Sequence, residues 1–230
     1  MAERVFNFYP GPATLPLPVL ETAREELLDF QSTGMSVMEI SHRSKQYENL
    51  QNETEARLKR LLNMGDNYKV IFLGGGASTQ FAMVPMNFLS PEKTADYLVT
   101  GSFAKKAYQE AKFYGHVHPA VDTSGENYRR LPRQEEINFS DNPVYVHLTS
   151  NNTIFGTQWQ TFPDCGNTPI IADMSSDLLS RCFDPEPFGL IYAGAQKNLG
   201  PAGVTIVIIR EDLLAKANPD LPVIYRYETF

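Results

Sequence analysis

The stretch Lys69-Val-Ile-Phe-Leu-Gly-Gly-Gly-Ala-Ser-Thr-Gln80 decides the fold class of this chain. From Val70 to Leu73 it is a continuous apolar run, which is typical of a strand covered on both faces. Three glycines then permit a tight turn, and residues 77–89 have the apolar spacing of a helix. A strand, a glycine turn and a helix in succession indicate an α/β protein.

The same alternation extends in both directions from this stretch. Further strands are expected at 97–100, 144–148, 169–173, 190–193 and 204–209, and further helices at 18–30, 46–64 and 103–114. Strands that alternate with helices predict an α/β fold with a mostly parallel sheet. Residues 122–142 are polar and irregular, and we expect them to form a surface excursion.

The division into domains is expected to be simple. Residues 1–15 are too rich in proline for a helix or a central strand, so they predict an extended arm. Residues 16–230 then form one large domain, which is long enough to bury a sizeable core.

Composition narrows the function classes. The net charge of −7 gives no basic face, which argues against nucleic-acid binding. No apolar run approaches the roughly 18 residues of a membrane helix, so no membrane partner is expected. The two cysteines, Cys165 and Cys182, do not have metal-ligand spacing, and so few thiols indicate a reducing, cytoplasmic location with no metal site.

Three features carry candidate chemistry. The Gly74–Gln80 turn before a helix offers backbone N–H groups and the Ser78 hydroxyl to a phosphate. Asp173 ends a strand, where it can pair with a protonated ring nitrogen beyond the sheet. Lys197 follows the next strand amid small residues, and a partly desolvated lysine is a nucleophile toward carbonyl groups. Together they match a site for pyridoxal 5′-phosphate (PLP).

Each feature alone has a simpler explanation. The glycine turn is also compatible with a packed strand-to-helix connection, and Asp173 with an N-cap of the next helix. Most lysines are solvated surface charges. The combination of the three features is what favours the cofactor site.

Several segments resemble the phosphoserine aminotransferase family, within the class V group of PLP enzymes that share the aspartate aminotransferase-type fold (fold type I). The segments are Phe6-Asn-Phe with Gly11-Pro-Ala, Ser36-Val-Met-Glu-Ile-Ser-His-Arg43, Gly74–Phe81, Ser150–Gly156, Ala172–Arg181 and Tyr192–Pro201. The similarity extends over essentially the whole chain.

The resemblance implies a role for each matching residue around the cofactor. Lys197 would form the Schiff base and shuttle the proton, and Asp173 would keep the ring nitrogen protonated. The other implied cofactor-binding residues are Ala77, Ser78 and Gln196 near the phosphate, Thr153 at the phenolic oxygen and Phe103 on the ring face. Phe103 stands where the family usually has tryptophan, so stacking would involve less area.

Substrate binding is implied for a separate pair of residues. Arg43 would hold the substrate carboxylate with a bidentate fork, and His42 would orient that arginine or meet a substrate phosphate. A surface ion pair of Arg43 with Glu39 or Glu48, and a packed His42, are the alternatives.

The implied reaction is transamination between L-glutamate and 3-phosphohydroxypyruvate, giving O-phospho-L-serine and 2-oxoglutarate in serine biosynthesis. The resemblance also implies a homodimer and a C-terminal small domain after the point where this chain stops. We therefore expect a fragment that by itself binds PLP weakly and turns over poorly. Normal specific activity of the purified 230-residue product would contradict this expectation.

Two other functions remain open at this point. One is a different class V enzyme, such as an alanine–glyoxylate aminotransferase or a cysteine desulfurase; desulfurases typically have histidine before the lysine, where this chain has Gln196. The other is a non-catalytic, truncated relic. Retention of Lys197, Asp173, Thr153 and Ser78 together argues against the relic.

Overall fold

The computed structural model describes residues 4–230. Within them, a seven-stranded sheet has the order β1-β9-β8-β7-β4-β2-β3. Its strands are β1 Tyr68–Leu73, β2 Thr94–Val99, β3 His116–Asp122, β4 Val146–Thr149, β7 Ile170–Asp173, β8 Phe188–Gly194 and β9 Thr205–Arg210. A small hairpin pairs β5 Asn151–Asn152 with β6 Thr157–Gln158.

The sheet is mostly parallel, as the alternation of strands and helices predicts. Strands β3, β2, β4, β7 and β8 pair in parallel in that spatial order. On the other side of β8, β9 runs antiparallel to both β8 and β1. The carboxyl ends of β4, β7 and β8 therefore meet at one edge of the sheet, which is where parallel α/β sheets bind ligands.

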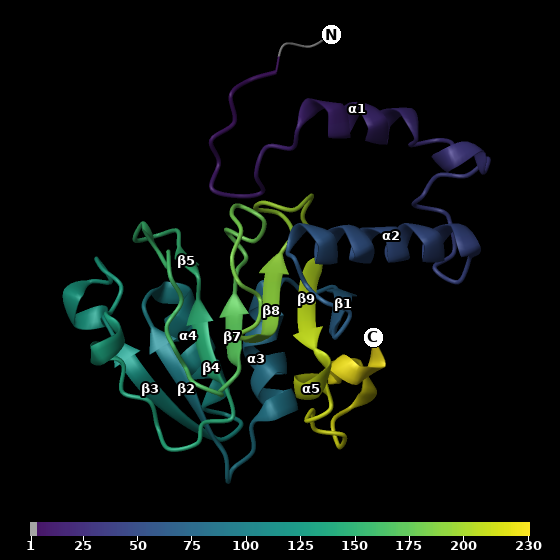
Figure 1. Ribbon diagram of the computed structural model, residues 1–230. Helices are drawn as coiled ribbons and strands as arrows, with labels where there is room; N and C mark the ends of the chain where they lie inside the picture. Colours follow the sequence, from purple (N-terminus) through teal and green to yellow (C-terminus); the bar gives the residue numbers. More distant parts are fainter. Residues whose placement is uncertain (1–3) are drawn as a thin grey trace.

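The helices cover this sheet unequally. They are α1 Leu17–Glu25, α2 Lys45–Leu61, α3 Ala77–Phe88, α4 Ser102–Ala111 and α5 Glu211–Leu214, with 3₁₀ turns at Phe30–Ser32, Ser124–Glu126, Gln134–Glu136, Val223–Tyr225 and Tyr227–Thr229. Helices α3 and α4 lie side by side on one face of the sheet (Figure 1). The opposite face is covered by the end of α2 and by loops.

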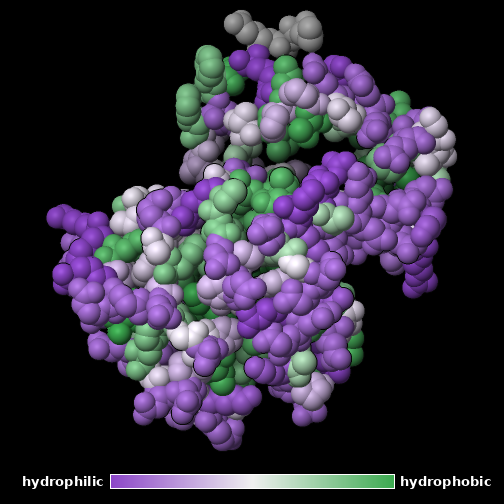
Figure 2. Space-filling model, viewed as in Figure 1, coloured by the Kyte–Doolittle hydropathy of each residue, from purple (hydrophilic) through white to green (hydrophobic). Residues whose placement is uncertain are grey.

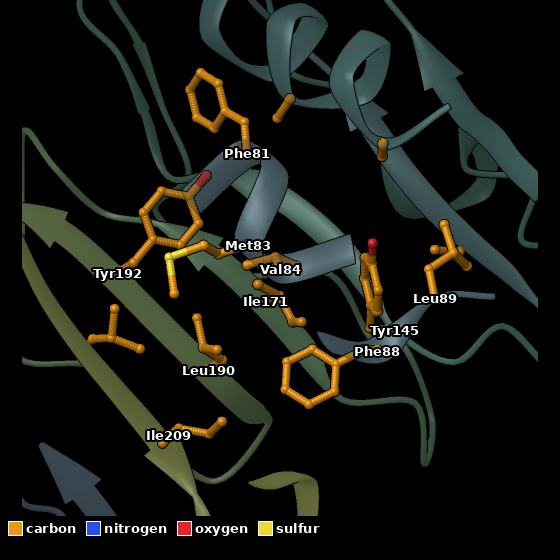
Figure 3. Close-up of a cluster of buried hydrophobic side chains, with 14 of the residues drawn as sticks. Phe81, Met83, Val84, Phe88, Leu89, Tyr145, Ile171, Leu190, Tyr192 and Ile209 are labelled. Carbon is orange, nitrogen blue, oxygen red and sulfur yellow. The ribbon is translucent and has the colours of Figure 1, made fainter. Parts of the chain in front are cut away.

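The core between α3 and the sheet positions that helix. Phe81, Val84 and Phe88 of α3 belong to the same buried cluster as Ile171, Leu190 and Ile209 of the strands (Figure 3). The Phe81 ring meets the Tyr192 ring edge-on, with 6.3 Å between the ring centroids. Packing on this scale fixes the amino end of α3 relative to the ends of β7 and β8.

His147 is a structural part of this core. It is buried on β4, its Nε2 lies 3.0 Å from the Tyr192 hydroxyl oxygen, and its ring stacks on Tyr97. Burial lowers the pKa of His147 to about 3, so the ring is neutral at physiological pH.

Several expected elements differ from the structure. The expected helix at 18–30 is α1 Leu17–Glu25, which ends five residues early and contributes no buried residue. Strand β3, at the edge of the sheet, was not expected, because His116, His118 and Pro119 do not resemble a strand. The region 122–142 is largely irregular, as expected, although Tyr128 and Ile137 are buried.

The N-terminal segment stands apart from the sheet. The expected arm is residues 1–15, of which 1–3 lie outside the described part of the chain; residues 4–16 contain no helix or strand. Large apolar side chains are exposed along this segment, α1 and the residues just after it, including Phe6 (92 %) and Leu28 (84 %). Figure 2 shows hydrophobic surface in this region above the sheet. In residues 4–230 no helix combines the length and apolarity needed to cross a bilayer.

Candidate cofactor site

A cavity of about 360 Å³ lies at the carboxyl ends of β4 and β7, bounded by the amino end of α3. It is lined by all seven residues that the sequence proposes for cofactor binding: Ala77, Ser78, Phe103, Thr153, Asp173, Gln196 and Lys197. These residues come from two helices, one strand and two loops. Their proximity is therefore a result of the tertiary fold.

The amino end of α3 forms one wall of this cavity. Gly75 and Gly76 have φ values of +87° and +74°, a region that favours glycine, and they turn the chain from β1 into α3. The Thr79 hydroxyl donates to the Gly75 carbonyl oxygen at 2.7 Å, so it is already used within the turn. Gly76, Ala77 and Ser78 line the cavity at the start of α3, where helix geometry leaves N–H groups without intrahelical acceptors. This end of the cavity suits an anion.

Asp173 forms the buried acidic part of the cavity. It is only 5 % exposed, and its Oδ1 accepts hydrogen bonds from the Ser175 amide at 3.0 Å and the Ser175 hydroxyl at 2.6 Å. Burial raises the pKa of Asp173 to about 6, against the opposing effect of the Ser175 hydrogen bonds. The alternative role of Asp173 as a helix N-cap is wrong, because no helix follows it in the described residues before β8; Oδ1 instead accepts hydrogen bonds within a turn, and the residue lines the cavity. A cationic N–H group placed here would favour the charged carboxylate.

Lys197 lies between this cavity and the N-terminal arm. Its ammonium group donates a hydrogen bond to the Pro10 carbonyl oxygen, and the neighbouring Gln196 carbonyl accepts from the Ala13 amide at 2.7 Å. A second cavity of about 460 Å³, bordered by Gly11, Gly75 and Ala202, also reaches Lys197. Lys197 therefore borders both cavities.

The remaining walls favour a flat ring with polar substituents. Phe103 and Ile154 provide apolar surface, and Lys106 Nζ lies 5.3 Å from the centre of the Phe103 ring. Thr149 also lines the cavity, and its buried hydroxyl has no hydrogen-bond partner within the described residues. A polar atom of a ligand in the cavity would give this hydroxyl a partner. An aldehyde-bearing pyridine with a phosphate matches the amine, carboxylate, helix end and apolar wall found here.

Thr149 was not singled out in the sequence. Its signal is positional: it is the last residue of β4, and it is paired in register with Asp173 on β7. That Thr149 lies beside Asp173 follows only from the pairing of the two strands.

The proposed substrate residues lie elsewhere. His42 and Arg43 occupy an exposed turn before α2 and are not among the residues that line the cavity. The alternative ion pairs of Arg43 are also not formed, because Glu48 pairs with Lys45 at 3.0 Å and Glu39 accepts from the Ser36 amide. Within this chain, the fold does not bring the pair to the candidate cofactor site.

Comparison with known proteins identifies the relatives of the chain. The family model described as aminotransferase class-V matches residues 5–223. The phosphoserine aminotransferase of Herpetosiphon aurantiacus is 59 % identical, over 98 % of this chain and 62 % of that protein. That of Niallia circulans is 56 % identical, over 100 % of this chain and 64 % of that protein. The chain therefore spans somewhat less than two thirds of the length of these relatives.

Solved structures give the same result for the fold. The phosphoserine aminotransferase from Bacillus circulans subsp. alkalophilus is 57 % identical with a TM-score of 0.96, covering 99 % of this chain and 63 % of that one. The PLP-bound phosphoserine aminotransferase from Trichomonas vaginalis is 39 % identical with a TM-score of 0.91, covering 98 % and 67 %. An aspartate aminotransferase from Thermus thermophilus, 17 % identical over 95 % and 60 %, has a TM-score of 0.70. The expectation of an aminotransferase fold is confirmed.

Proposed function

The chain belongs to the aminotransferase class-V family, and we propose that it forms the PLP-binding large domain of a phosphoserine aminotransferase. The proposed reaction moves an amino group between L-glutamate and 3-phosphohydroxypyruvate. The observation that carries the proposal is the single cavity that unites Lys197, Asp173 and the amino end of α3. Relatives named phosphoserine aminotransferase at 53–59 % identity supply the substrate class.

PLP, when bound, supplies an aldehyde that takes up amino groups and a ring that accepts electrons from the reacting carbon. The Lys197 amine would serve as the nucleophile toward that aldehyde and as the base that moves the proton at the substrate α-carbon. Asp173 keeps the ring nitrogen protonated through its carboxylate. The amino end of α3, with Ser78, would hold the phosphate, and Phe103 would pack against the ring, since these residues line the cavity.

The position of His42 and Arg43 bears on the assembly. Because their turn lies outside the cavity of its own chain, we propose that they act on substrate bound to a second copy in a homodimer. Exposed apolar side chains such as Phe8 and Leu28 are consistent with burial in such an assembly. A molar mass equal to one chain, measured by light scattering at micromolar concentration, would contradict the homodimer.

A cytoplasmic location is part of the same proposal. Cys165 and Cys182 are both free thiols, which is compatible with a reducing compartment. The net charge of −7 supports small-molecule substrates rather than nucleic acid as partners.

The proposal is tested by trapping the cofactor. The purified chain is incubated with PLP, reduced with borohydride and digested, and the modified peptide is identified by mass spectrometry. We expect the added mass on Lys197, its loss in Lys197→Ala, and its retention in the matched surface variant Lys105→Ala. Modification spread over surface lysines, with no preference for Lys197, would contradict the proposal.

The substrate class is tested separately. Half-reactions with O-phosphoserine, alanine and cysteine, followed by the absorbance of the bound cofactor, distinguish the class V activities. Conversion by O-phosphoserine alone supports the proposal, whereas conversion by alanine or cysteine alone points to another class V enzyme.

A further inference from the structure

The hydroxyl of Thr149 is a buried polar group that the fold leaves without a partner. Thr149 is 4 % exposed, and its Oγ1 makes no hydrogen bond to any described residue. A buried hydroxyl without a partner is destabilising, because it gives up its hydrogen bonds to water and gains none in return. Here the residue lines the candidate cofactor cavity, so a bound ligand can supply that contact.

The register of the sheet places Thr149 beside Asp173. The two residues are paired across the parallel strands β4 and β7, so their side chains project from the same face of the sheet. Two residues earlier on these strands, the paired residues His147 and Ile171 point into the core beneath α3. Thr149 and Asp173 therefore form adjacent parts of the cavity floor.

Asp173 does not use the Thr149 hydroxyl. Its Oδ1 accepts from the amide and the hydroxyl of Ser175, and Thr149 Oγ1 makes no hydrogen bond to the carboxylate. The donor and acceptor capacity of the threonine thus stays available next to the carboxylate.

We propose that Thr149 is a further positioning residue for the cofactor, whose hydroxyl hydrogen-bonds the polar edge of the pyridine ring beside Asp173. This inference rests on the proposed function. Its chemical content is specific, because a methyl group in place of the hydroxyl preserves shape but removes the bond.

Other buried threonines provide the contrast. Thr123 is 5 % exposed and its Oγ1 also lacks a partner within the described chain, yet it does not line the cavity. Thr123→Val is therefore a matched control for loss of a buried, unpaired hydroxyl at a distance from the site.

The experiment measures PLP affinity by fluorescence titration for the wild type, Thr149→Val, Thr149→Ser and Thr123→Val. We expect Thr149→Val to weaken PLP binding about tenfold, which corresponds to one well-formed hydrogen bond. Thr149→Ser should stay within about twofold of the wild type, and Thr123→Val should not change the affinity. Equal affinities of wild type and Thr149→Val would overturn the inference.

A spectroscopic readout separates positioning from folding. The pH titration of the bound cofactor's absorbance should shift in Thr149→Val and return to the wild-type midpoint in Thr149→Ser. Thermal unfolding without PLP shows whether each variant folds. If Thr149→Val does not fold, Thr149→Ser tests the inference instead. A serine hydroxyl that positions the ring must keep the wild-type midpoint of the pH titration, and a shifted midpoint in Thr149→Ser would contradict the inference. If the wild type binds no PLP and forms no Lys197 adduct, the proposed function is wrong. If the wild type forms the adduct and Thr149→Val binds PLP as tightly as the wild type, only the inference about Thr149 is wrong.

Discussion

The backbone of Gly11 lies so close to the side chain of Lys197 that a β-carbon at Gly11 would stand 2.8 Å from Nζ and 2.9 Å from Cε. Gly11 also has φ = +141°, a conformation that L side chains rarely adopt. The neighbouring Pro10 carbonyl accepts a hydrogen bond from the same amine. Residues 10 and 11 of the N-terminal segment therefore contact the side chain of Lys197 directly.

Gly11→Ala is expected to weaken PLP binding by at least about tenfold, because the methyl group must displace either the arm or the lysine. Affinity and the borohydride-trapped Lys197 peptide measure the effect. Gly125→Ala is the matched control, because a β-carbon there meets nothing within 4 Å. Equal trapping in Gly11→Ala and Gly125→Ala would show that the contact is unimportant.

Asp173→Asn is expected to stabilise the cofactor-free chain above pH 6. The pKa of Asp173 is raised from 3.8 to about 6 in the folded state, so the folded protein holds this proton more tightly than the unfolded chain. The associated stability is present below about pH 4 and is lost as the pH rises through about 6, where the ionised carboxylate costs up to about 3 kcal/mol. Urea unfolding should show the variant more stable than the wild type at pH 8, with the difference largely gone near pH 4.

The same substitution should have the opposite effect on ligand binding. Asparagine has no negative charge to stabilise a cationic ring nitrogen, so PLP should protect Asp173→Asn against unfolding less than it protects the wild type. Equal protection at pH 8 would argue against contact between Asp173 and the ring nitrogen.

Phe103→Trp is expected to tighten PLP binding about threefold, because a larger aromatic wall stacks with more area. The control is Phe113→Trp, at an exposed position just beyond α4 that does not line the cavity. Fluorescence titration of both variants measures the change. A weaker affinity of Phe103→Trp would indicate that the cavity has no room for the indole.

Ser78→Ala is expected to weaken binding of PLP about tenfold while leaving pyridoxal, which lacks the phosphate, nearly unaffected. The reason is that Ser78 stands in the first turn of α3, where the anion would bind. Competition titrations with the two compounds measure the difference. Ser180→Ala, at an exposed position outside the cavity lining, should bind both compounds as the wild type does. If Ser78→Ala loses as much affinity for pyridoxal as for PLP, the phosphate does not bind at the amino end of α3.

Local patterns in the sequence determined the α/β class and most of the elements. The continuous apolar runs of β1, β7, β8 and β9 predict buried strands because a strand covered on both faces has no polar alternation. The glycine turn before α3, the position of Asp173 at the end of a strand and that of Lys197 after the next strand were also predicted from the sequence. This part of the candidate site could be predicted because its residues lie at or just after the carboxyl ends of strands. In a parallel sheet these ends lie together at one edge.

Tertiary structure alone decided what depends on pairing and packing between distant segments. The antiparallel direction of β9 and the edge strand β3 follow from sheet pairing, which no local pattern specifies. Thr149 lies beside Asp173 because of the strand register. Gly11 lies beside Lys197 because the N-terminal segment packs there. His42 and Arg43 have a motif like the other site residues, but the turn before α2 keeps them outside the cavity. The chemistry of a residue is local, whereas its partners depend on contacts that form only when the whole domain is folded.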